Sequence, residues 1–192
     1  MNLASLISIL LFVTLASTRK TFGTCDMPRL VQEFKVEDYM GTWYEIFRDK
    51  ETRMEGKGVC ANAKYTYNKD EETVSVVNTF YDKEDHRNVE IKGTAKCDGP
   101  KCRIVYDEEH KADYRVVLTD YNTYSLVYAC KNLVFGLFKE EHLWVFSRTP
   151  DIHHDYMRFV YQAMDEQLPD YDVDWLHEVY QGEKCDYKPS LY

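Results

Sequence analysis

The chain has 192 residues, of which 44% are hydrophobic and 15% aromatic, and this is too much apolar material for a disordered protein. The length fits one domain with a single sizeable core. The formal net charge of −9 argues against a nucleic-acid-binding protein, which would present a basic face.

The first segment of the chain is an apolar run over residues 3–16, followed by Arg19 and Lys20. The run is shorter than the roughly 20 residues that cross a bilayer, so it predicts a secretory signal peptide over residues 1–23. A membrane anchor is the alternative. Two cleavage sites are possible, after Ala16 and after Gly23, because each would place small residues at the positions that signal peptidase requires. Residues 24–192 are then expected to form one secreted, extracellular domain.

Six cysteines all follow this segment, and an even number in a secreted chain suggests disulfides. The sequence alone does not choose among the pairings. Cys97 and Cys102 are the exception, because they flank an Asp-Gly-Pro turn and could form a local bridge. A metal site is the rival interpretation, but no second Cys or His pair stands at zinc-finger spacing, so no metal is expected.

The middle of the chain has the alternation of half-buried strands. In residues 61–68, for example, Ala63, Tyr65 and Tyr67 share one face while Asn62 and Lys64 share the other. The predicted strands are residues 42–49, 61–68, 73–81, 89–96, 102–107, 114–119, 124–131 and 142–147. Short polar turns separate them, which indicates an antiparallel meander and hence a barrel or a sandwich.

The pattern changes to a helical period after the last predicted strand. Residues 151–168 predict an amphipathic helix, which Pro169 ends. An eight-stranded barrel leaves an interior wide enough for one small ligand. The helix could then pack against the outside of such a barrel.

Three short motifs carry a resemblance to a known family. They are Gly41 and Trp43 at the first strand, Thr119, Asp120 and Tyr121 after the sixth, and Arg148 after the eighth. In this order and at these strand ends, they resemble the motifs of the lipocalins. Within that family the chain is most similar to the branch of apolipoprotein D and the insect bilin-binding proteins, whose signature has the form of residues 120–130. The resemblance implies an all-β fold, an eight-stranded antiparallel up-and-down barrel with one C-terminal helix outside.

The resemblance also implies structural roles. Trp43 would close one end of the barrel beneath Arg148, and Asp120 would bind the backbone of its own turn. The branch has two disulfides, which correspond here to Cys25–Cys130 and Cys60–Cys185. Cys97–Cys102 would be an additional bridge near the closed end.

The predicted ligand site lies inside the barrel. Alternation and the resemblance select Glu45, Phe47, Tyr65, Tyr67, Asn78, Phe80, Phe138, Trp144 and Phe146. This mostly aromatic set suits a small hydrophobic molecule bound non-covalently by a secreted carrier, such as a neutral lipid, a steroid-like compound, a retinoid or a fatty acid. The resemblance implies histidines on the inner wall of bilin binders, but Phe80 and Phe138 stand at those positions here. This departure disfavours a bilin, which is kept as the alternative ligand.

Charge and apolar exposure suggest two further features. Acidic residues at the predicted mouth, such as Asp82 and Asp107, favour neutral lipids over free fatty acids. The apolar segment from Leu133 to Phe138 would either contact a membrane or lipoprotein or fold over the cavity as a lid.

No catalytic constellation is visible in the sequence. The serine-hydrolase elbow, the zinc-protease motif and the phosphate loop are all missing, so we expect neither an enzyme nor a required cofactor. His153 and His154 are predicted to point apart on the helix. A secreted interaction protein with a sealed barrel stays open as a further alternative, with a cell-surface receptor as its possible partner.

Overall fold

The computed structural model describes residues 20–50, 52 and 58–187, so most of the predicted signal peptide lies outside the described residues. Strands dominate the fold. They are β1 (Lys20–Phe22), β2 (Gly41–Asp49), β3 (Val59–Asn68), β4 (Thr73–Asp82), β5 (Arg87–Asp98), β6 (Lys101–Val105), β7 (Lys111–Thr119), β8 (Tyr124–Leu133), β9 (Phe138–Ser147) and β10 (Leu176–Glu178). The helices are α1 (Val36–Tyr39) and α2 (His154–Gln167), with 3-10 turns η1 (Val134–Gly136) and η2 (Val173–Trp175).

The sheet is antiparallel, and consecutive strands pair from β2 to β9. Pairing of β2 with β9 closes it into a barrel, which leaves no open edge between the first and last of these strands. All eight predicted strands are confirmed. The additional strands β1 and β10 were not predicted because each has only three residues; they pair with the outer ends of β9 and β2.

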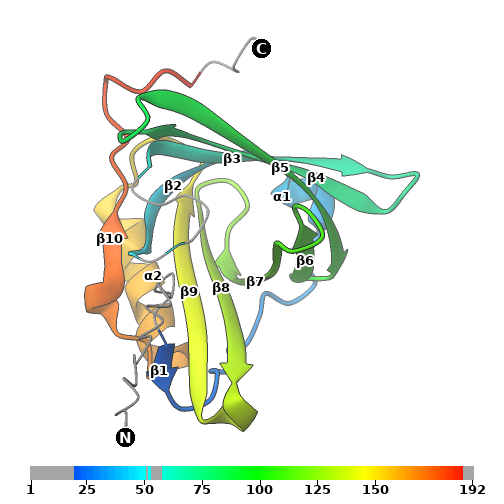
Figure 1. The fold of residues 1–192 in the computed structure, drawn as a ribbon, viewed down its shortest axis with the longest axis vertical. Helices are drawn as coiled ribbons and strands as arrows, with labels where there is room; N and C mark the ends of the chain where they lie inside the picture. Colours follow the sequence, from blue (N-terminus) through cyan, green and yellow to red (C-terminus); the bar gives the residue numbers. More distant parts are fainter. Residues whose placement is uncertain (1–19, 51, 53–57, 188–192) are drawn as a thin grey trace, which may run out of the picture.

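Helix α2 lies outside the barrel, as expected (Figure 1). Its buried residues Met157, Val160 and Met164 pack on the outward face of β8 and β9. The helix begins three residues later than predicted because the backbone of His153 is extended, with φ −65° and ψ 140°, and its side chain accepts a hydrogen bond from the Asp155 amide. His153 is therefore the N-cap of the helix.

The closed end of the barrel is built around Trp43, which is fully buried. The Arg148 guanidinium lies 3.7 Å from the centre of the Trp43 ring, and its Nη1 donates to the Thr42 carbonyl at 2.9 Å. Gly41 has φ +97°, and a Cβ there would come within 3.3 Å of Arg148 Nη1, so glycine suits both the backbone and the space. The cation–π contact and the hydrogen bond together seal the base of the barrel.

The turn between β7 and β8 supports the same end. Asp120 Oδ1 accepts hydrogen bonds from the amides of Thr123 at 2.7 Å and Tyr124 at 3.1 Å. Thr119 Oγ1 donates to the Tyr124 carbonyl at 2.8 Å, and the Tyr121 carbonyl accepts from Arg148 Nε at 2.9 Å. The turn motif thus binds its own backbone and also holds the arginine that covers Trp43.

Three disulfides join Cys25 to Cys130, Cys60 to Cys185 and Cys97 to Cys102. The first two are the pairs that the resemblance implied, and the third is the local bridge that the turn predicted. The first ties the N-terminal arm to β8, and the second ties the C-terminal tail to β3. The third links β5 and β6 beside their turn at the closed end. All six cysteines are therefore oxidised, which is typical of proteins in an oxidising compartment.

Helices long and apolar enough to cross a bilayer are absent from the part of the chain that the structure describes.

Candidate ligand-binding site

The barrel holds a cavity of about 50 Å³. Six of the predicted ligand-binding residues line it: Glu45, Tyr65, Asn78, Phe80, Trp144 and Phe146. They come from β2, β3, β4 and β9. Four of the six are aromatic, which suits a site for a hydrophobic molecule.

The prediction that Phe47 faces the cavity is wrong. A bulge interrupts the pairing of β2 with β9 between Glu45 and Phe47, so the strand gains one residue and the alternation reverses. Phe47 stands opposite Val145 and packs with the cluster beneath α2. Arg48 takes the inward place instead, opposite Trp144.

Tyr67 and Phe138 also lie outside the cavity lining. Tyr67 is two residues beyond Tyr65 on β3 and packs into the core of the closed end, so its inward direction leads below the cavity. Phe138 is at the tip of the β8–β9 hairpin, where it is 40% exposed and its ring meets Phe22 edge-on at 5.9 Å. The β8–β9 hairpin is longer than the cavity is deep, so Phe138 lies beyond the cavity. Alternation predicts which face a residue is on but not how far along the barrel it lies.

Several lining residues were missed. Between them β6 and β7 contribute Ile104, Ala112 and Tyr114, and the segment joining these strands contributes Tyr106. Alternation would have found these positions, because Ile104 and Tyr106 lie two residues apart on one face of the chain, as do Ala112 and Tyr114 on β7.

A cluster of tyrosine hydroxyl groups lies on the closed-end side of the cavity. The Tyr39 hydroxyl lies 2.9 Å from that of Tyr114 and 2.8 Å from Ser125 Oγ, and the Tyr65 hydroxyl donates to Tyr114 at 3.1 Å. Burial raises the pKa of Tyr39 to about 12 and raises the pKa of Tyr114 well above its ordinary value. These hydroxyl groups therefore stay neutral and hydrogen-bonded at physiological pH.

The side wall carries a buried ion pair and an amide. Arg48 Nη1 donates to Glu45 Oε1 at 2.8 Å, and Arg48 Nη2 donates to the Gly58 carbonyl at 2.8 Å. Glu45 is 3% exposed and Arg48 is fully buried. Asn78 Nδ2 donates to the Tyr106 hydroxyl at 3.2 Å. The polar part of the site is thus fixed by side chains that hold one another in place.

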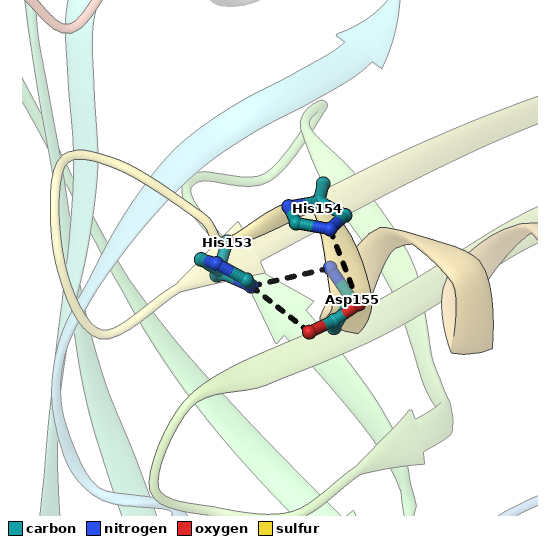
Figure 2. A group of neighbouring side chains, drawn as sticks. All are labelled: His153, His154 and Asp155. Atoms are coloured by element: carbon teal, nitrogen blue, oxygen red, sulfur yellow. Dashed lines mark hydrogen bonds and ion pairs between the residues drawn. The ribbon is translucent and has the colours of Figure 1, made fainter.

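One group of side chains outside the cavity has the residue types of a metal site. His153, His154 and Asp155 each offer a ligand atom, and these atoms lie within 4.8 Å of one another (Figure 2). The imidazole rings stand 4.3 Å apart, so the prediction that they point apart is wrong, because His153 precedes the helix. All three residues are exposed, and each histidine nitrogen already has an Asp155 oxygen at 3.3–3.4 Å. The helix cap accounts for this group.

Comparisons with known proteins agree with this architecture. A family model described as Lipocalin-like domain matches residues 34–181. Apolipoprotein D of Mus musculus is 31% identical over 145 residues, which cover 73% of this chain and 74% of that protein. The Lazarillo protein of Schistocerca americana is 26% identical and covers 74% of this chain and 68% of that protein.

Solved structures show the same fold at lower identity. Insecticyanin from the tobacco hornworm Manduca sexta has a TM-score of 0.76 at 18% identity, over 88% of this chain and 92% of that chain. Apocrustacyanin C1 also has a TM-score of 0.76, at 20% identity over 88% of this chain and 94% of that chain. With the family model covering most of the barrel and apolipoprotein D as a relative, the chain belongs to the lipocalin family.

Proposed function

We propose that this chain is a secreted carrier that holds a small hydrophobic molecule in its barrel, non-covalently and without catalysis. The observation that carries the proposal is the cavity itself. Its wall is lined by Tyr65, Phe80, Trp144 and Phe146, and one end of the barrel is closed beneath Trp43. Such a site removes an apolar ligand from water while one end stays open for entry.

Secretion is supported by two features. All six cysteines are bridged, and the apolar run over residues 3–16 has the pattern of a signal peptide. The bridged cysteines also leave no thiol to serve as a nucleophile, which supports a carrier over an enzyme.

The test is quenching of tryptophan fluorescence by a panel of neutral lipids, retinoids, steroids and fatty acids. Trp144 lines the cavity, so we expect saturable quenching by at least one member of the panel. The matched control is Trp144→Phe, which keeps the aromatic wall and the other two tryptophans and should lose most of the quenching. An absence of saturable quenching by every member would contradict the proposal and favour an interaction protein with a sealed barrel.

A bilin is the second candidate ligand. The fold that this chain shares with insecticyanin supports this candidate. Against it, Phe80 on the cavity wall offers a chromophore only an apolar contact. A visible absorption band in protein purified from its natural source would identify a bound pigment and would replace the lipid as the proposed ligand.

A contact with lipid surfaces is proposed for the β8–β9 hairpin tip. Phe135 is fully exposed, Val134 is 60% exposed, and Phe22 from β1 adds a further exposed ring beside the tip. Phe135 has φ +57° and is not part of the cavity lining, which favours a surface contact over a lid. Liposome flotation should show binding that Phe135→Asp abolishes and Phe159→Asp, a matched exposed position on α2, preserves. Equal binding by all three proteins would exclude the contact.

A further inference from the structure

The polar groups on the cavity wall have an uneven chemistry. The Glu45 carboxylate is buried on this wall, whereas the Asp113 side chain is 41% exposed and pairs with the exposed Arg103 on the outer face of the barrel. Among the described residues that line the cavity there is no lysine, arginine or histidine. Glu45 is already paired with a cation, since Arg48 donates to it at 2.8 Å. A ligand in the cavity therefore finds no cation among the described lining residues.

Asn78 adds an acceptor that has no partner among the described residues. Its Nδ2 donates to the Tyr106 hydroxyl at 3.2 Å, while its Oδ1 is buried and makes no hydrogen bond. A buried carbonyl oxygen without a partner costs free energy, and the cost is removed when a donor arrives. Asn78 stands on β4 opposite Ala63, whose small side chain leaves room on the same wall.

From this arrangement we propose that the cavity selects neutral hydrophobic ligands that carry a hydrogen-bond donor, an alcohol in the simplest case, and rejects carboxylates. The proposal rests on the carrier function and names its ligand class. The ligand hydroxyl donates to Asn78 Oδ1, which completes the hydrogen bonds of that amide. A ligand carboxylate would bring no donor to Asn78 Oδ1 and would face the Glu45 carboxylate with no cation among the described lining residues, so it would lose its hydration without compensation.

Retinoids test the proposal because retinol, retinal and retinoate share one hydrocarbon body and differ only at the terminal group. Retinol has a donor, retinal has only an acceptor, and retinoate is an anion near neutral pH. We expect retinol to bind about fivefold more tightly than retinal and at least roughly tenfold more tightly than retinoate, when the dissociation constants are measured by tryptophan quenching.

The variant Asn78→Leu assigns the effect to the amide. It keeps a side chain of similar size but removes the acceptor, so the difference between retinol and retinal should vanish. Asn122→Leu is the matched control, because Asn122 is exposed in the β7–β8 turn and the same substitution there should leave both ratios unchanged. The wild-type series alone tests the ligand class if Asn78→Leu fails to fold.

The outcomes separate the two claims. Retinoate or retinal binding as tightly as retinol would overturn the donor preference and leave the carrier function standing. A wild-type protein that binds no retinoid and no member of the lipid panel would overturn both.

Discussion

Arg48 and Glu45 form an ion pair at 2.8 Å inside the barrel, although strict alternation along β2 would place Arg48 on the outside. The bulge between Glu45 and Phe47 turns the arginine inward, next to a carboxylate that lines the cavity. One extra residue in β2 thus places a buried charge pair beside the cavity and removes Phe47 from the cavity lining.

Removing one partner of this ion pair should lower the free energy of unfolding more than removing both partners. Glu45→Gln leaves the Arg48 charge buried without its carboxylate, and we expect a loss of about 3–5 kcal/mol in the free energy of unfolding. The double variant Glu45→Gln, Arg48→Met removes both charges and should be more stable than Glu45→Gln. Urea unfolding of the wild type and both variants measures the effect. Equal destabilisation by the single and double variants would contradict the interpretation.

Strand periodicity predicted the fold well because alternation is a local property of the chain. It found the eight barrel strands, and six of the nine residues predicted for the ligand site line the cavity. Phe47 and Arg48 were beyond its reach, because a bulge is set by pairing with a distant strand. His153 and His154 were misread for a related reason: the sequence pattern extends the helix into its cap, where the backbone direction changes. Two of the disulfides came from the family resemblance, whereas Cys97–Cys102 was predicted from the turn between its two cysteines.

The three disulfides should contribute unequally to stability. Cys60–Cys185 closes a separation of 125 residues, whereas Cys97–Cys102 closes only 5. In the loop-entropy account these bridges stabilise the fold by about 5 and about 2 kcal/mol. Paired Cys→Ser variants, compared by guanidinium unfolding, should follow this order. A larger loss from the short bridge would show that it has a local role beyond chain entropy.

The buried tyrosines predict a loss of stability in alkali. The pKa of Tyr39 is about 12 in the folded protein against 10.0 for the exposed side chain, because burial disfavours the phenolate. The folded state therefore retains a proton that the unfolded state releases, and stability falls as pH rises from about 10 to 12, by about 3 kcal/mol for this group. Tyr39→Phe should reduce the slope. Spectrophotometric titration should show a tyrosine fraction that ionises only on unfolding; early ionisation of all tyrosines would contradict this.

The position of β1 distinguishes the two cleavage sites. Lys20 and Phe22 pair with Glu140 and Phe138 on β9, and the Gly23 amide donates to the Leu137 carbonyl at 3.0 Å. Cleavage after Gly23 would remove this strand, whereas cleavage after Ala16 would keep it. We expect the secreted protein to begin at Ser17, as N-terminal sequencing or intact mass would show. A mature chain that begins at Thr24 would mean that β1 is absent from the secreted form.

The central claim, that a hydrophobic ligand occupies the barrel, is tested most directly by mapping the bound ligand with amide and indole chemical shifts. On addition of retinol, we expect the largest shifts at the Trp144 indole and at the amides of Ala63, Asn78 and Ala112, which surround the cavity. Shifts confined to Phe22 and residues 134–138 would place the ligand on the exposed hairpin tip and would contradict a carrier that binds inside its barrel.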